Sequence, residues 1–338
     1  MSTNASVKTV LKRGALVAAA NWQVTAIQFV ADTTVNLLLT VPMVGGGLMV
    51  ALVLGQALPD LSFADLRSSL TGVASVLMSE PIALVSFLLS LGVVGVAGSV
   101  LLFLTKGGTV AVLAEGERAA GPVEEPPLLL TTVATGSCFG LTRFQQGCTK
   151  YFRRFVRLGL VLMVVYAGSG AVYLGVLFGN LPAALTPESN TAWTVTAGIA
   201  STVLAIWVTL VNFAYLLIQM VVVVDDCGVR QASRRVVGFL RGQPRPVLSV
   251  FGLVVLLVVG ATVISVVATT SLGLIAFVPF VGLAVVPLQL LAWLFRGIVF
   301  QFIGLSALSA YLHMYRRHLN PERELPSPMA PPHQSPFV

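Results

Sequence analysis

Long apolar stretches recur along the chain, separated by shorter segments in which the charged residues gather. A helix needs about 20 apolar residues to cross a hydrocarbon core that is ~30 Å thick. Six stretches have that length: 24–43, 81–104, 158–179, 193–222, 247–270 and 286–311. The pattern predicts an all-α, polytopic integral membrane helix bundle with about six transmembrane helices.

Two apolar runs continue beyond the length of one crossing, into residues 44–58 and 271–285. Pro42 and three consecutive glycines interrupt the first run, and Pro279 and Pro287 interrupt the second. Non-helical backbone at membrane depth is tolerated only where protein or water covers it. We therefore expect interfacial or re-entrant segments in preference to further spans, although length by itself leaves extra spans open.

The composition indicates that lipid is the main solvent of the protein. Hydrophobic residues make up 56% of the 338 residues and charged residues only 10%, and the mean hydropathy is +0.92. Soluble domains carry about 25% charged residues, so a large part of this surface is expected to face hydrocarbon. Residues 1–23 and 316–338 flank the transmembrane domain 24–315 as cytoplasmic tails, and the second tail is so rich in proline that we expect disorder.

The basic residues lie almost entirely on one side of the predicted membrane. The two tails and the connections 105–157 and 223–246 contain 18 of the 20 lysines and arginines. Because positively charged loops stay in the cytoplasm, both termini are predicted to be cytoplasmic, in the inner (plasma) membrane of a bacterium. This asymmetry also accounts for the net charge of +7, so no nucleic-acid partner is expected.

At about 100° per residue, residues 141–157 and, more weakly, 229–241 place apolar side chains on one arc of a helix and basic side chains on the other. We expect two cytoplasmic amphipathic elbow helices whose apolar faces enter the acyl boundary. Their basic faces are expected to meet anionic lipid headgroups, through Arg143, Lys150, Arg153, Arg154, Arg157, Arg230, Arg234 and Arg241. A topology anchor and a specific site for lipid or protein both fit this pattern. Each elbow follows an acidic stretch and precedes a span, which indicates an internal structural repeat of two copies.

Polar residues occur inside the predicted spans, where each is costly and therefore a candidate for function. They lie on the first, fourth and sixth spans: Gln28, Asp32, Asn36, Asn212, Gln219, Gln289 and Arg296. Because lipid does not solvate such groups, we expect these faces to meet inside the bundle, and Asp32 to approach Arg296 directly or through water. Polar contacts that fix helix packing and a polar pocket or translocation path both remain open.

The sequence contains no recognisable pattern of catalytic or metal-ligating residues. The three cysteines and three histidines lack metal-ligand spacing, and no glycine-rich segment has a phosphate-binding context. Glu115, Glu117, Glu124 and Glu125 lie in a loop with proline and glycine, so we interpret them as solvated charge. The sequence thus predicts neither an enzyme nor a metal site or cofactor.

Three segments carry a resemblance to known proteins: KRGALVAAANWQVTAIQFV near the N-terminus, TKGGTVAVLAEG ending at Gly116, and VVVVDDCGVRQASRRVVGFLRG at 221–242. They resemble a broad group of uncharacterised bacterial six-span proteins, which is similar to the membrane domain associated with some bacterial glycerophosphodiester phosphodiesterases. The resemblance implies a six-helix membrane domain that is accessory or lipid-associated. The soluble catalytic barrel of those phosphodiesterases has no counterpart in this sequence, so no catalytic residue is carried over.

Abundant membrane-surface chemistry without a catalytic pattern favours a non-enzymatic membrane module, either a scaffold or accessory subunit or a lipid-interacting protein. Its expected partners are membrane lipids with anionic headgroups at the cytoplasmic face, with another membrane protein as a further candidate. The alternative is a small secondary transporter or permease whose polar path surrounds Asp32 and Arg296.

Overall fold

A computed structural model describes residues 7–54, 81–121, 123–124, 130–179, 187–276 and 281–319, and within these ranges every regular element is an α-helix. The helices are α1 (Val7–Ala20), α2 (Trp22–Leu54), α4 (Pro81–Ala119), α5 (Leu130–Thr135), α6 (Leu141–Gly179), α7 (Pro187–Val224), α8 (Val229–Gly242), α9 (Pro244–Ala276) and α10 (Val281–Leu319). Six of them, α2, α4, α6, α7, α9 and α10, are long and apolar enough to cross a membrane. This confirms the predicted all-α polytopic bundle.

The described residues of the two overlong apolar runs are helical. Their described residues extend α2, α9 and α10, so the predicted interfacial or re-entrant segments do not form at 44–54, 271–276 and 281–285, while 55–58 and 277–280 lie outside the described residues. Pro42 lies inside α2 and Pro287 inside α10, and membrane helices tolerate such breaks because neighbouring groups satisfy the freed carbonyls. With 33 residues, α2 is about 50 Å long. Such a length exceeds one hydrocarbon thickness and is accommodated by tilt.

The chain repeats one arrangement three times: an amphipathic segment followed by two spanning helices that form a hairpin. The first unit contains α1, α2 and α4, the second contains α6 with its amphipathic start and α7, and the third contains α8, α9 and α10. The sequence pattern predicted two copies and missed the first, because residues 1–23 were interpreted as a polar tail. In α1 the buried residues recur at helical spacing on one face, although one of them is an arginine: Val10, Arg13, Gly14, Val17 and Ala18.

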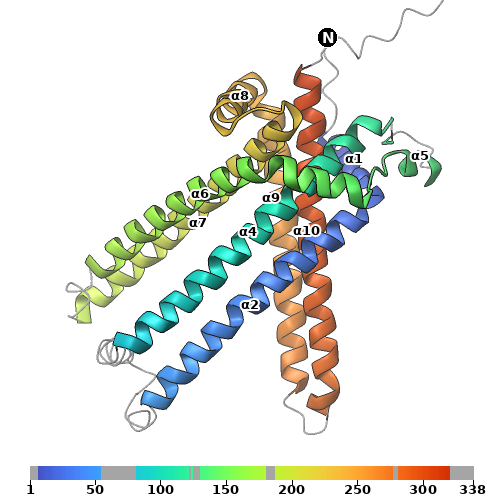
Figure 1. The fold of residues 1–338 in the computed structure, drawn as a ribbon. Helices are drawn as coiled ribbons and strands as arrows, with labels where there is room; N and C mark the ends of the chain where they lie inside the picture. The colour runs from blue at the N-terminus through green and yellow to red at the C-terminus, as the bar shows by residue number, and fades with distance from the viewer. Residues whose placement is uncertain are drawn as a thin grey trace, which may run out of the picture.

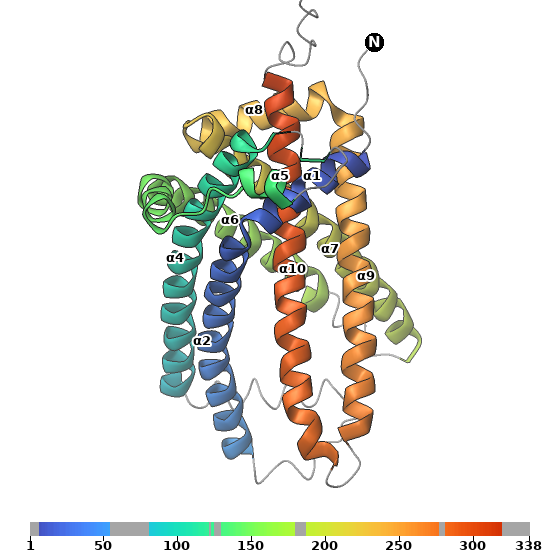
Figure 2. The ribbon, with the colours of Figure 1, turned by 90° about the vertical axis from the view of Figure 1, so that its right-hand side faces the viewer.

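The three units interlock at one end of the bundle. Each amphipathic segment packs on the second spanning helix of the preceding unit: α1 on α10, the start of α6 on α4, and α8 on α7. Figure 2 shows α1 crossing α10. The helices α4, α7 and α10 also contact one another in pairs. The order of contacts therefore closes a ring in which the third unit meets the first.

The packed core lies at the end of the bundle where α1, α5, α8 and the start of α6 gather, which we call the core end (Figure 1). Leu217, Phe239 and Tyr311, from three different helices, are at most 2% exposed there. Away from the core end the hairpins diverge, as Figure 1 shows. In the most apolar stretch of α6, 0% of the residues are buried inside the protein. In a membrane these diverging apolar faces meet lipid.

Glycines set the closest approaches within this ring. A Cβ atom on Gly14 of α1 would overlap the carbonyl oxygen of Ser306 and lie 2.8 Å from the backbone nitrogen of Ala310, both in α10. A Cβ atom on Gly147 of α6 would lie 2.8 Å from the Cβ of Ala111 in α4. Small residues let membrane helices approach this closely, so both contacts of the ring require the absence of a side chain.

The substitution Gly14→Val is expected to loosen α1 from α10 and to lower the free energy of unfolding by about 1–3 kcal/mol, the usual cost of overpacking. Gly304→Val is the matched control, because a Cβ at Gly304 of α10 meets nothing within 4 Å. The measurement is thermal unfolding of both purified variants in a neutral detergent. Equal melting temperatures for the two variants would contradict this packing.

Candidate functional site

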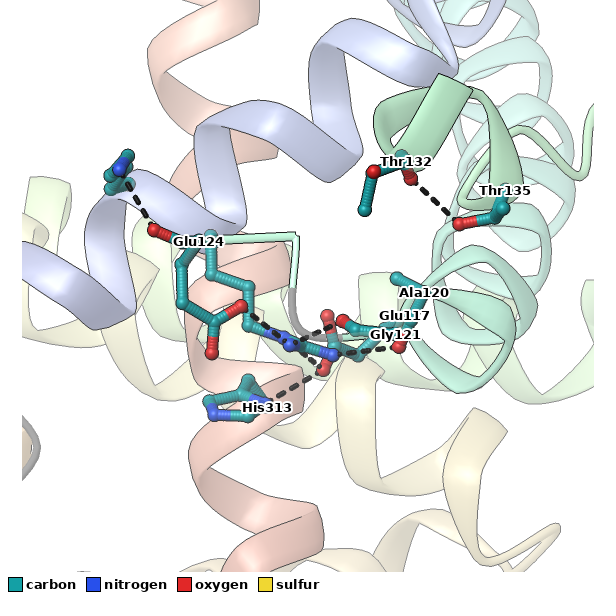
Figure 3. Close-up of polar contacts among 9 residues, drawn as sticks. Glu117, Ala120, Gly121, Glu124, Thr132, Thr135 and His313 are labelled. Carbon is teal, nitrogen blue, oxygen red and sulfur yellow. Dashed lines mark hydrogen bonds and ion pairs between the residues drawn. The ribbon is translucent and has the colours of Figure 1, made fainter. Parts of the chain in front are cut away.

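One set of buried charged side chains converges where α1 meets the end of α4. Arg13 Nε donates to Glu117 Oε1 at 2.9 Å, and Arg13 Nη1 donates to Glu124 Oε2 at 2.7 Å. The same guanidinium donates to the carbonyl oxygens of Gly121 at 2.9 Å and Ala120 at 3.0 Å. Figure 3 shows these oxygens around one cation. Every nitrogen of this buried guanidinium therefore has an oxygen partner.

His313 of α10 joins this network through Glu117, as Figure 3 shows. Its Nδ1 lies 2.8 Å from Glu117 Oε1, which thus bridges Arg13 and His313. The Glu117 side chain is 2% exposed, so its interpretation as solvated charge is wrong. Burial by itself lowers the pKa of Arg13, but the carboxylates of Glu117 and Glu124 outweigh it and raise that pKa above its usual value. The guanidinium stays charged and links α1 to α4 and α10.

Asp226 forms a second charged cluster, in the turn between α7 and α8. Its backbone is in the left-handed region, with φ of 48°. Its carboxylate pairs with Lys150 at 2.9 Å and with Arg154 at 2.5 Å, both on the amphipathic start of α6. Hydrogen bonds from these two cations hold the pKa of Asp226 below its usual value. The turn is thereby tied to the first helix of its own unit.

The neighbouring Asp225 reaches the third unit. It accepts a hydrogen bond of 2.6 Å from the Tyr315 hydroxyl of α10 and pairs with Arg235 of α8 at 2.6 Å. Two adjacent aspartates thus connect α6, α8 and α10 to the end of α7. The sequence showed the acidic turn but gave no means of naming these partners, which come from distant parts of the chain.

The apolar faces of both predicted elbows are covered by protein, so their predicted insertion into the acyl boundary is wrong. The core contains the following residues from these faces: Phe144, Cys148, Tyr151 and Phe155 of α6, and Ala232, Val236 and Phe239 of α8. The first elbow is also no separate helix, because residues 141–157 continue without a break into the spanning part of α6. An apolar arc indicates that a face is buried and leaves open whether protein or lipid buries it.

The basic faces of the elbows divide into partnered and unpartnered residues. Lys150 and Arg154 pair with Asp226, and Arg143 Nη1 donates to the Cys138 carbonyl at 3.0 Å. Among the described residues, a second group is exposed and makes no hydrogen bond or ion pair: Arg153, Arg157, Arg230, Arg234 and Arg241. Because the opposite faces of the two helices are packed in the core, these arginines are held at the surface of the core end.

The polar residues predicted inside the spans do not form one cluster. Gln28 Oε1 accepts a hydrogen bond from Thr109 of α4 at 2.9 Å, and Asn212 Oδ1 accepts one from Tyr166 of α6 at 2.6 Å. Two of the predicted residues form no hydrogen bond with the others: Gln219, which is buried, and Gln289, which is partly buried. The hydrogen bonds of Gln28 and Asn212 join helices within a hairpin, which favours a packing role for these two residues.

Asp32 and Arg296 form no ion pair in the described structure, so the predicted direct contact is wrong. Asp32 Oδ2 instead accepts a 3.4 Å hydrogen bond from Asn36, one turn further along α2. The reason is the rotation of α10, whose Gly297 faces Phe29 of α2 so closely that a Cβ there would overlap the ring. Arg296, about 100° further round the helix, is therefore turned away from α2 and is exposed.

Lys106 of α4 is a further cation on a spanning helix, and it forms no ion pair with Asp32 in the described structure. Its Nζ lies 5.2 Å from the centre of the Tyr215 ring of α7, within the range of a cation–π contact. The sequence assigned Lys106 to the connection after the second span, but α4 continues as helix to Ala119. The apolar stretch predicted for this span ends at residue 104, so the sequence did not show that the helix continues. The continued helix places Lys106 in the region where α2, α4 and α7 lie together.

No protein-family model, curated protein or solved structure matches this chain. The resemblance to the membrane domain associated with glycerophosphodiester phosphodiesterases therefore stays a prediction from the three sequence segments. Arg13 lies in the first of those segments, Lys106 in the second and Asp226 in the third. The segments that carry the resemblance are thus also those that join the units of the fold.

Arg13→Ala is expected to lower the free energy of unfolding by about 3–5 kcal/mol, because it leaves the buried Glu117 carboxylate without its cation. The matched control is Arg118→Ala, which breaks the exposed Arg118–Glu115 pair, whose side chains are 65% and 44% exposed. That change is expected to cost less than about 1 kcal/mol. Unfolding of both variants in neutral detergent measures the difference, and similar losses would show that the Arg13 network does not hold the fold.

Proposed function

We propose that the protein is a lipid-interacting membrane module, in an accessory or scaffolding role, that binds anionic phospholipid headgroups through the exposed arginines of α6 and α8. One observation carries this proposal: five exposed arginines of these helices have no partners within the described structure, while the opposite faces of their helices are packed in the core. They are Arg153, Arg157, Arg230, Arg234 and Arg241. Each basic residue near an anionic leaflet contributes about 1 kcal/mol of attraction. A basic surface without internal counter-charges is therefore suited to a membrane surface.

The distribution of charge supports an orientation with the core end in the cytoplasm of the inner membrane. The exposed arginines of α6 and α8 lie at this end, and the start of α1 and the end of α10 also lie there (Figure 2). Positively charged segments stay on the cytoplasmic side, which supports an orientation with both termini inside. The exposed arginines then face the anionic lipids of the inner leaflet.

A groove of about 700 Å³ along α6 and α7 supports contact with the acyl chains of lipids. Its lining includes apolar side chains such as Val172 and Ile199. Trp207, which also lines it, donates from Nε1 to Ser169 Oγ at 2.9 Å, so this polar group is satisfied within the protein. A groove of this kind on membrane-spanning helices suits a hydrocarbon chain, because the chain brings no polar group of its own.

The triple variant Arg230→Gln, Arg234→Gln, Arg241→Gln is expected to weaken binding of phosphatidylglycerol by at least about tenfold, since three attractions of about 1 kcal/mol are lost. Native mass spectrometry of the detergent-solubilised protein, titrated with phosphatidylglycerol and with phosphatidylcholine, measures this change. The matched control replaces the same three arginines with lysine, which keeps the charge and is expected to keep the preference. Equal binding of the two lipids by the wild type would refute the proposal.

A second candidate function, a secondary transporter or permease, is favoured by a different observation. Lys106 and Asp32 place opposite charges on spanning helices. Within the part of the chain that the structure describes, further polar atoms of spanning helices are buried without a hydrogen-bond partner: Thr25 Oγ1, Gln219 Nε2, Ser306 Oγ, Ser309 Oγ and Tyr311 OH. Ionisable groups at membrane depth often mark a path for ions or solutes. Water in such a path would satisfy these atoms.

If this path exists, Asn36→Cys reacts with a membrane-impermeant, water-soluble maleimide above the labelling of the wild type. Leu37→Cys is the matched control, because Leu37 is the next residue of α2, about 100° round the helix, and its apolar side chain is 58% exposed. Labelling in sealed vesicles followed by mass spectrometry measures both. Equal labelling of the two cysteines would remove the transporter from consideration.

A further inference from the structure

A polar cavity of about 410 Å³ lies at the core end, between the ends of α4 and α7, the start of α6 and the last turns of α10. All three units of the fold therefore contribute to its wall. Its volume falls within the range of about 300–1,000 Å³ that is typical of small-ligand sites. Four basic residues line it: Arg118, Arg143, Lys150 and Arg316.

Carboxylates in the lining neutralise only some of these cations. Glu115 pairs with Arg118 at 3.5 Å, and Asp226 pairs with Lys150 at 2.9 Å. The other two arginines of the lining have no carboxylate partner within the described structure. The cavity wall therefore keeps a formal excess of two positive charges.

Arg316 and Arg143 have donor groups that no described residue accepts from. Arg316 is partly buried, and its Nη2 donates to the Ala114 carbonyl at 2.5 Å, whereas its Nη1 is buried without a hydrogen-bond partner. Arg143 makes its one hydrogen bond to the Cys138 carbonyl. An unpaired guanidinium donor in a buried position is unfavourable unless another group accepts from it. A bound anion supplies that acceptor once the Arg316 side chain turns Nη1 toward the cavity.

The third unit departs from the other two at this place. In the first two units a carboxylate lies at or just after the end of the second spanning helix, Glu117 in α4 and Asp226 after α7, and pairs with an amphipathic segment. The last turn of α10 carries basic residues instead, Arg316 among them. The three units thus share a fold, while the third contributes positive charge where the others contribute negative charge.

We propose that this cavity binds a phosphate group, with Arg316 and Arg143 donating to its oxygens. A phosphate monoester carries about −1.5 to −2 charges at pH 7, which matches the excess charge of the wall. The planar guanidinium also fits phosphate oxygens in pairs. The phosphate comes either from the headgroup of a membrane lipid or from a soluble phosphate compound. This site goes beyond the proposed surface binding, because it lies in a cavity and uses α10.

The test measures the melting temperature of the full chain in neutral detergent with inorganic phosphate, glycerol 3-phosphate or a short-chain phosphatidic acid. A ligand that binds only the folded state raises the melting temperature with its concentration. We expect stabilisation of the wild type and an apparent affinity at least tenfold weaker in Arg316→Gln. Stabilisation by all three probes assigns the site to soluble phosphate compounds as well as lipids, and stabilisation by phosphatidic acid alone assigns it to a lipid headgroup.

Arg143→Gln repeats the test at an exposed residue, so that the outcome does not depend on the folding of the Arg316 variant. Arg241→Gln removes the same charge outside the cavity and is expected to bind the probes as the wild type does. The triple α8 variant is also expected to keep this binding, which separates the cavity from the surface proposed for anionic lipids. No stabilisation of the wild type by any probe, or equal stabilisation of the wild type and Arg143→Gln, overturns the proposal.

Discussion

Apolar helices gain little from packing on one another in a membrane, because hydrocarbon solvates them as well as a neighbouring helix does. This constraint explains why the hairpins diverge over most of their length and why the packed core gathers at one end (Figure 1). At this end, the helices are held together by contacts of the amphipathic segments, which the apolar pattern of the spans does not provide. Each amphipathic segment packs on the second spanning helix of the preceding unit, and the contact of α1 with α10 closes the ring.

Charged side chains fix how the amphipathic segments are aligned along the spanning helices that they contact. A buried ion pair adds little stability by comparison with apolar packing, but a charge left without its partner is costly. Arg13 has an oxygen partner for each guanidinium nitrogen, from Glu117, Glu124 and two backbone carbonyls. A shift of α1 relative to the end of α4 breaks this set at once. Asp226 fixes the second unit in the same way through Lys150 and Arg154.

The same packing determines how the basic surface is presented. A free amphipathic helix binds a bilayer by inserting its apolar face, with the charges adding to that insertion. Here the apolar faces of α8 and of the start of α6 are packed in the protein core. In the proposed function, attraction to headgroups therefore comes from the exposed arginines alone. Under this proposal, such a surface is attracted to the anionic headgroups of the leaflet without inserting into it. This separation of folding from lipid contact is the physical basis of the proposed function.

The sequence by itself determined the all-α class and the six spans, because these depend on the length and apolar character of local stretches. It also located the basic surfaces, since helical periodicity places Arg153 and Arg157 on one arc. Only the tertiary structure decided that Arg13 lies in the core with Glu117, that Lys106 lies over the Tyr215 ring, and that Asp32 pairs with Asn36 and not with Arg296. The physical reason is that the environment of a helix face depends on which neighbouring helix, if any, packs against it. Periodicity identifies a face that avoids water, whereas the rotation and contacts of neighbouring helices decide whether protein or lipid covers it.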